Sequence, residues 1–304
     1  MLLFAEQLLN GLQLGITLFL MSAGLTLIFG IMQVINLAHG SFYMIGAYVC
    51  ASVAASTGSF ILGLLAALPA AAAVGMAVEF LIFRRLYHRE HLDQVLATFG
   101  LIMFFNELTR IIWGRQPLFM DVPVWLGGSV ELLPGMIYPV YRLAVIFVGL
   151  GVALFLWVLF SKTKLGMQIR AGASNRAMVG ALGVNIRLLY TWVFGLGALL
   201  AGLAGVMAGP ILAVESGMGE SILILTFVVI VIGGIGSVRG ALAGALLVGL
   251  VDTLGRAFLP DLFRLVFPAA HADGAAASIA SMSIYILMAA ILVWKPQGLF
   301  PAHN

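Results

Sequence analysis

The feature that most constrains this chain is a succession of long apolar runs separated by short polar segments. We count nine runs, near residues 8–30, 40–56, 60–83, 94–113, 140–160, 188–210, 222–237, 240–258 and 278–294. A helix needs about 20 apolar residues to cross a membrane, and fewer where it is broken or buried in a bundle. Because glycines interrupt the stretch 222–258, we predict an all-α, polytopic transmembrane helical bundle of eight or nine spans with broken helices.

Composition agrees with a membrane protein that has little soluble mass. The 304 residues are 62% hydrophobic and 9% charged, whereas soluble domains are about 25% charged. We therefore expect one transmembrane domain over residues 1–304. The segment before the first run lacks the basic residues of a secretory signal peptide, so we expect that run to be retained as a span. Cys50 is the one cysteine in the sequence, which excludes an intrachain disulfide.

The charges between the runs predict which ends of the bundle face the cytoplasm. Residues 161–187 carry five basic residues and no acidic one, and residues 84–93 carry three arginines. Basic loops stay on the cytoplasmic side of a membrane. Counting spans outward from these loops predicts an external N-terminus, an external loop at 114–139 and a cytoplasmic C-terminus. The segment 259–277, with two prolines and several charges, is expected to lie along the external membrane surface.

Polar residues interrupt the apolar sequence between Gly24 and Tyr48. Hydrocarbon offers such groups no hydrogen-bond partners, so they must face protein or a water-filled path. On a continuous helix Gln33, Asn36, Gly40 and Tyr43 share one face, since they fall at steps of three and four, and His39 lies beside it. One interpretation makes these five residues a wall or gate of a translocation path. The alternative, which we favour for His39, is inter-helix hydrogen bonding that fixes the bundle.

A second interruption, Gly233-Gly-Ile-Gly-Ser-Val-Arg-Gly240, falls in the second half of the chain. Broken segments in matching halves of a transporter point to a central path. We therefore assign Gly233, Gly234 and Gly236 to the same path or gate as the first interruption.

The basic segment 161–187 contains the pattern of a short helix. Ser174 can cap a helix that runs through Ala177, Met178 and Ala181 and ends at Gly183. Its small apolar face lies outside the membrane next to Arg176, which suits docking into a groove of another protein. The alternative is an interfacial helix that rests on lipid headgroups.

The sequence lacks the motifs of the common enzymes. It contains no phosphate-binding Gly-x-x-x-x-Gly-Lys-Ser/Thr loop, so we do not expect the chain to hydrolyse ATP itself. It also has no His-Glu-x-x-His, no Cys-x-x-Cys and no Gly-x-Ser-x-Gly motif, and its five histidines are scattered. We therefore predict a non-catalytic protein with no catalytic residue, no metal site, no cofactor of its own and no nucleic-acid partner.

Charged residues inside the apolar runs are few. Glu107 is followed by Arg110 and Asp252 by Arg256, at spacings that allow pairing along a helix. Glu79 lies near Arg84, but not at a helical pairing distance. Carriers coupled to protons or sodium normally need an acidic group near the membrane midplane. Both candidate acids have a local partner. We therefore favour a protein driven by the ATPase of another subunit, and an ATP-independent carrier or channel is the weaker alternative.

Three stretches together resemble the permease subunits of branched-chain amino acid ABC importers. They are Gly24–Tyr48, Phe227–Asp252 and the ending Trp294–Phe300, and residues 169–185 are similar to the ATPase-coupling segment of these permeases. The chain looks like the shorter, first permease of a pair. In two places it departs from the family pattern, because Ser174-Asn-Arg-Ala lacks the usual acidic residue and Ile222–Thr226 lacks a lysine common in other members.

The resemblance implies a permease that moves branched-chain or similar amino acids across the bacterial cytoplasmic membrane by alternating access. Its implied partners are a second homologous permease, two cytoplasmic ATP-binding subunits that hold ATP and Mg²⁺, and a periplasmic or extracellular solute-binding protein. The contact with the ATPase would lie on Ser174, Arg176, Ala177, Met178, Ala181 and Gly183. Permeases for urea and short-chain amides share these motifs, so such a substrate remains an alternative.

Overall fold

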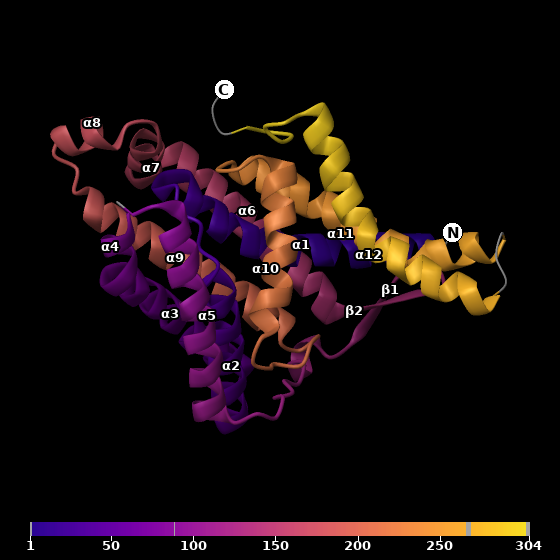
Figure 1. Ribbon diagram of the computed structural model, residues 1–304. Helices are drawn as coiled ribbons and strands as arrows, with labels where there is room; N and C mark the ends of the chain where they lie inside the picture. Colours follow the sequence, from indigo (N-terminus) through magenta and orange to yellow (C-terminus); the bar gives the residue numbers. More distant parts are fainter. Residues whose placement is uncertain (1, 88, 266–268, 302–304) are drawn as a thin grey trace.

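The computed structural model describes residues 2–87, 89–265 and 269–301, and most of them are helical (Figure 1). In chain order the elements are α1 (Leu2–Met32), α2 (His39–Thr57), α3 (Phe60–Val78), the π-helical η1 (Glu79–Phe83), α4 (Arg84–Leu86), α5 (His91–Trp113), the short 3₁₀-helix η2 (Val124–Leu126), β1 (Ser129–Leu133), β2 (Met136–Pro139), α6 (Val140–Lys162), α7 (Lys164–Ser174), α8 (Arg176–Ala181), α9 (Ile186–Ala208), α10 (Met218–Gly233), α11 (Val238–Arg264) and α12 (Ala269–Trp294).

Seven helical segments within the described ranges are long and apolar enough to cross a membrane. They are Leu2–Met32, Phe60–Leu86, His91–Trp113, Val140–Lys162, Ile186–Ala208, Val238–Arg264 and Gly274–Trp294. The two other predicted spans are the helices α2, of 19 residues, and α10, of 16 residues. Helix α10 is shorter than a typical span, and the first ten residues of α2 are all buried. The prediction of an all-α polytopic bundle with broken helices is confirmed.

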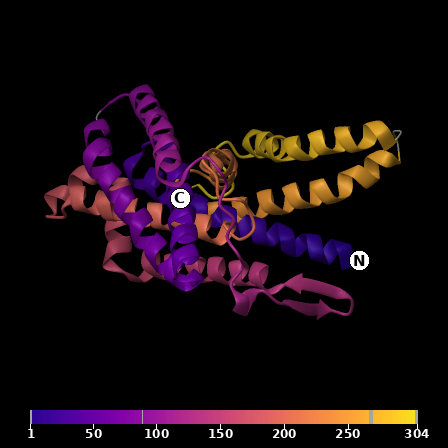
Figure 2. The same ribbon diagram turned by 90° about the horizontal axis from the view of Figure 1, so that it is seen from below.

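Helix α1 forms the centre of the bundle and packs against α9 and α11 through glycines. A Cβ atom added at Gly15 would lie 2.9 Å from the carbonyl oxygen of Ala245 on α11, and one added at Gly24 would lie 2.5 Å from that of Gly197 on α9. Small residues allow helix backbones to approach closely in a membrane, where apolar burial between helices contributes little. The α11–α12 hairpin extends beside the N-terminal half of α1 (Figure 2), where Phe4 and Phe258 stack with ring centroids 5.9 Å apart.

The basic segments gather at one end of the bundle, with α4, α7, α8 and the C-terminal segment on the same side (Figure 1). There the Nη2 atom of Arg84 donates a hydrogen bond to the Thr191 hydroxyl at 2.8 Å. The amide of Phe300 donates to the carbonyl of Gly233 at 2.9 Å. We call this the basic end.

The connection 114–139 lies at the other end and contains η2 and the antiparallel β1–β2 hairpin. Leu118 forms an isolated bridge with Val214 in the α9–α10 connection. The Tyr138 hydroxyl donates to the Asn10 side chain at 3.2 Å, next to the start of α1. The segments that the charges assign to two opposite sides therefore lie at opposite ends of the bundle.

The prediction of a surface segment at 259–277 is wrong. Helix α11 continues through Pro260 to Arg264, and α12 begins at Ala269; residues 266–268 lie outside the described ranges. A proline inside a helix removes only one backbone donor. Asp261 and Arg264 pair one turn apart at 3.6 Å, so the charges that indicated a surface segment fit the outside of a helix.

Candidate functional site

The polar stretch after α1 is a true break rather than a kinked helix. Residues 33–38 are non-helical, and Gln33 has a φ of 55°, which is uncommon outside glycine. The expectation that Gln33 and Asn36 share a helical face with Gly40 and Tyr43 is therefore wrong. Asparagine competes for backbone hydrogen bonds and disfavours the helix interior, and the two β-branched residues before it weaken the helix further.

The break carries the chain back into the bundle before α2 begins. The Nε2 atom of His39, the first residue of α2, lies 3.3 Å from the carbonyl oxygen of Met21. Met21 precedes the end of α1 by eleven residues, which corresponds to about 17 Å at 1.5 Å per helical residue. Gln33, at the other end of the break, is exposed at the basic end, where Arg176 of α8 approaches its side-chain oxygen to 3.5 Å.

Helix α10 begins next to the start of α2. Residues 209–217 lead from the end of α9 to Met218 without forming a helix. A Cβ atom added at Gly40 would lie 2.3 Å from the carbonyl oxygen of Gly219, and one added at Gly219 would lie 2.2 Å from that of Gly40. The two backbones are thus in direct contact, and each position requires glycine. We call this contact the Gly40–Gly219 junction.

From this junction the two helices lead to opposite ends of the bundle. The α2 side chain of Ser52 accepts a hydrogen bond from Trp113, the last residue of α5, next to the 114–139 connection. Helix α10 ends at Gly233, at the basic end. The junction is therefore the meeting point of two helix N-termini, which carry a partial positive charge. Converging half-helices of this kind surround the central sites of many transporters.

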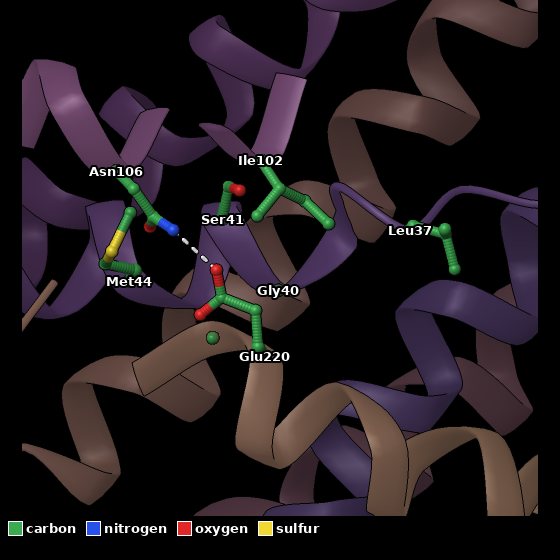
Figure 3. A pocket seen from close by; sticks show the side chains of 8 residues that line it. Leu37, Gly40, Ser41, Met44, Ile102, Asn106 and Glu220 are labelled. Atoms are coloured by element: carbon green, nitrogen blue, oxygen red, sulfur yellow. Dashed lines mark hydrogen bonds between the residues drawn. The ribbon is translucent and has the colours of Figure 1, made fainter. Parts of the chain in front are cut away.

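A small pocket lies beside the junction, between α2, α5 and α10 (Figure 3). Its lining residues are Leu37, Gly40, Ser41, Met44, Ile102, Asn106, Gly219 and Glu220. Asn106 of α5 donates a 2.5 Å hydrogen bond to the carboxylate of Glu220 across the pocket. Glu220 lies in the first turn of α10, where the helix dipole favours a carboxylate. No basic side chain in the described ranges forms an ion pair with it.

Glu220 is the residue of this site that sequence reasoning missed. The charge pattern places it in an external segment before the run 222–237. One sequence pattern could have identified Glu220 as a residue of a helix start. It is the third residue of a helix that begins after Gly217, and glutamate is favoured at that position. What the sequence could not reveal is that the segment before it folds back against Gly40.

The polar residues of the first break differ in their partners. Asn36 is fully buried, and neither its side-chain oxygen nor its nitrogen has a hydrogen-bond partner among the described residues. Buried polar groups rarely lack a partner. His39 is also fully buried; its Nε2 contacts the Met21 carbonyl, whereas its Nδ1 has no hydrogen-bond partner among the described residues. Tyr43 is buried on α2 where Gly205 of α9 contacts its carbonyl group.

The second interruption forms a tight α10–α11 turn at the basic end. Gly234 and Gly236 have φ values of 105° and 84°, and Gly233 contacts the backbone of Gly240. Gly236 lies against Gly30 of α1, so the structure brings the two interrupted segments together there. It does not bring Gly233, Gly234 or Gly236 next to Gly40, because the 16 residues of α10, about 24 Å of helix, separate them.

The predicted short helix is present in the basic segment as α8. Its cap is Asn175, whose side chain accepts a hydrogen bond from the amide of Met178 at 3.0 Å. The prediction of Ser174 as the cap is wrong, because Ser174 is the last residue of α7 and has helical geometry. Gly183 follows the helix with a φ of 88°, as its predicted role requires.

The apolar residues of α8 are mostly exposed. Ala177, Met178 and Ala181 are exposed, as is Leu182 at 77%. Only Val179 of this helix is buried. An exposed apolar surface outside the membrane-crossing helices is typical of a docking site for another protein.

Comparisons with known proteins agree with these features. Residues 7–292 match the family described as "Branched-chain amino acid transport system / permease component". The high-affinity branched-chain amino acid transport system permease protein LivH of Salmonella typhimurium is 30% identical over 275 residues, which cover 86% of this chain and 89% of LivH. BraD of Pseudomonas aeruginosa, which has the same description, is 30% identical over 310 residues, covering 97% of this chain and 95% of BraD.

A more distant relative transports a sugar. The ribose import permease protein RbsC of Escherichia coli is 26% identical over 246 residues, 77% of this chain and 72% of RbsC. No solved structure matches the chain. From the match over most of its length, together with the helical bundle, the chain belongs to the family of branched-chain amino acid transport system permease components.

Proposed function

We propose that this protein is the membrane-spanning permease subunit of an ATP-driven importer that moves branched-chain or similar amino acids by alternating access. The observation that carries the proposal is the match to relatives described as branched-chain amino acid permeases over 86–97% of the chain. The sequence supplies no ATP-binding loop, so the energy must come from another subunit. The urea and amide alternative has no relative among these matches to favour it.

The proposed partners are a second homologous permease, two ATP-binding subunits that hold ATP and Mg²⁺, and an external solute-binding protein. Helix α8 would dock on an ATP-binding subunit, because Met178 on this helix and Leu182 directly after it are exposed. The contact of Arg176 with Gln33 would connect a movement of α8 to the first break. The chain would lie in the bacterial cytoplasmic membrane with the basic end inside and the N-terminus outside.

The Gly40–Gly219 junction is the proposed gate of the translocation path, with Asn36, His39 and Tyr43 around it. Its backbones touch, so a path through this point would be closed in this conformation. A carboxylate without an ionic partner is costly against lipid. Glu220, which has none among the described basic residues, would therefore face the path or the second permease. Gln33 and the glycines at 233, 234 and 236 would form the inner mouth.

Assembly and transport test this proposal directly. The chain is co-expressed with the ATP-binding, permease and binding proteins encoded beside it, purified through a tag on this chain and reconstituted in liposomes. We expect the ATP-binding subunits and the second permease to co-purify, and the ATPase rate to rise when the binding protein carries leucine, isoleucine or valine. Uptake of these amino acids by the chain alone, without ATP, would overturn the proposal.

The docking role of α8 has its own test. Ala177→Glu places a charged side chain on the exposed helix surface, so it should uncouple ATP hydrolysis from transport, with transport reduced at least tenfold and the complex still folded. The matched control is Ala55→Glu, the same change on an exposed residue near the end of α2. Gly183 is less suitable, because its left-handed backbone makes any substitution strained. Unchanged transport in Ala177→Glu would remove the docking assignment.

A further inference from the structure

A large groove lies between α6 and α11 on the outside of α1, separate from the Gly40–Gly219 junction. Its volume is about 920 Å³, and residues of α7 and of the turn before α11 line its basic end. The floor is the α1 segment from Phe19 to Ile31. Those twelve steps of helix span about 18 Å, which is close to half of the roughly 30 Å hydrocarbon core of a bilayer. The groove is therefore about as deep as one lipid leaflet.

Two arginines line the basic end of the groove. Arg170 of α7 and Arg239 in the first turn of α11 line it, and neither forms an ion pair with a carboxylate in the described ranges. Ser237 caps α11 by accepting a hydrogen bond from Gly240 at 3.1 Å. A basic residue at a helix N-terminus opposes the helix dipole, so Arg239 adds to a positive charge that the fold leaves uncompensated.

The length of the groove is mostly apolar and adjoins an exposed apolar surface of α6. Its apolar lining includes Leu27, Leu156, Trp157, Phe160 and Leu242. The outer surface of α6 continues it with large exposed apolar residues, Phe147, Leu150 and Leu154. A side chain with an apolar body and a polar tip, such as tryptophan, is favoured where a membrane meets water.

One polar group inside the groove has no partner. Thr26 of α1 is 1% exposed, it lines the groove, and its hydroxyl makes no hydrogen bond with any described residue. Buried hydroxyls rarely lack a partner, and an acceptor on a molecule in the groove would supply one. A lipid ester carbonyl is such an acceptor, located between a headgroup and its acyl chains.

We propose that this groove binds an anionic phospholipid. The headgroup phosphate lies on Arg170, Arg239 and the N-terminus of α11, the ester region faces Thr26, and one acyl chain runs along α1 between α6 and α11. Basic pockets between membrane helices are general recognition sites for anionic headgroups. A small polar solute matches the arginines but leaves the apolar length of the groove empty. The proposal does not depend on the transported substrate.

Lipid retention by the purified complex tests the site. Native mass spectrometry counts phosphatidylglycerol and phosphatidylcholine retained by the complex during a lipid titration in detergent. We expect the wild type to prefer phosphatidylglycerol, and the double variant Arg170→Gln/Arg239→Gln to lose this preference by roughly tenfold or more. The matched control, Lys164→Gln/Arg187→Gln, removes two charges from the same basic segment outside the groove. Equal retention in the two double variants would overturn the proposal.

Two further experiments identify the molecule that is bound in the groove. Ala153→Trp fills the apolar length of the groove without touching the arginines, so it should lower retention of both lipids; unchanged retention would place the acyl chain elsewhere and overturn the proposal. Soluble glycerol phosphate, which has the headgroup phosphate without acyl chains, should compete only at far higher concentration than the lipid. Competition at equal concentration, or loss of the ATP-binding subunits from Arg170→Gln/Arg239→Gln, would reassign the arginines to a free anion or to the ATPase.

Discussion

At the scale of single residues, the buried carboxylate of Glu79 shows how a local irregularity creates a contact that spacing does not predict. Glu79 is fully buried and lies 3.3 Å from Nε of Arg84, five residues later. Five residues do not share a face of an α-helix, but the π-helical turn η1 widens the helix by one residue and aligns them. The sequence therefore contains both partners but not their geometry.

The same carboxylate connects η1 to α9. It accepts hydrogen bonds from the Tyr87 hydroxyl at 2.8 Å and from the Thr191 hydroxyl at 2.6 Å. Burial raises the pKa of the Tyr87 phenol, and the negative charge of Glu79 raises it further, so the phenol stays protonated and remains a donor. Every oxygen of Glu79 is thus satisfied, which is the condition for burying a charge in a bundle.

We expect Glu79→Gln to lower the free energy of unfolding by about 2 kcal/mol, because it weakens several hydrogen bonds to one buried charged group. An SDS titration of the purified protein in mild detergent measures this loss. The control is Glu107→Gln, which removes the exposed pair with Arg110 and should change stability by less than about 1 kcal/mol. Similar losses in both variants would show that the Glu79 contacts contribute no more than a surface ion pair.

At the scale of the elements, hydrophobic patterning locates the apolar helices and the interruption after Gly233, but not the geometry of the first break. The runs 40–56 and 222–237 correspond to α2 and α10, since apolar runs with a polar boundary predict helices well. Periodicity could not reveal that Gln33 and Asn36 leave the helix, because a continuous helix would also place them on one side. Nor could it show that Gly40 and Gly219, far apart in sequence, require each other.

The junction predicts that alanine is tolerated at neither glycine. Gly40→Ala or Gly219→Ala forces the starts of α2 and α10 apart, since the new methyl group would lie within 2.3 Å of a carbonyl oxygen. We expect each variant to lose at least tenfold in reconstituted transport. The control is Gly100→Ala on α5, where an added Cβ meets no atom of the described chain within 4 Å and alanine favours the helix. Wild-type transport in Gly40→Ala would exclude the junction as the gate.

At the scale of the whole molecule, the distribution of charge predicts the arrangement of the loops well. The two basic segments at 84–93 and 161–187 lie at one end and the 114–139 connection at the other, as the alternation of spans requires. Pro260 and its neighbouring charges misled the prediction, because helix α11 accommodates them on its surface. The cap of α8 was misplaced by one residue, since Ser and Asn are both good caps and only the end of α7 decides between Ser174 and Asn175.

Membrane orientation can be measured with single cysteines. Cys50 is 0% exposed, so the native chain should react poorly with a charged maleimide and serves as the background. We expect Ser129→Cys, in the hairpin connection, to be labelled from outside intact cells. Leu182→Cys, next to α8, should be labelled only after the membrane is permeabilised. Labelling of both from the same side would contradict the opposite placement of these segments.

The separation of Gly40 from Gly219 in the sequence has a consequence for the synthesis and membrane insertion of the protein. The two residues are 179 positions apart, and ribosomes add roughly 5–20 residues per second. For about 10–35 s the nascent chain therefore holds α2 and the polar break before it without the helix that will cover them. Insertion machinery selects segments by their hydropathy. It should recognise α2 poorly, because α2 is not among the seven strongly apolar spans. We therefore expect insertion of α2 to depend on an insertase or membrane chaperone that protects the first break until α10 emerges.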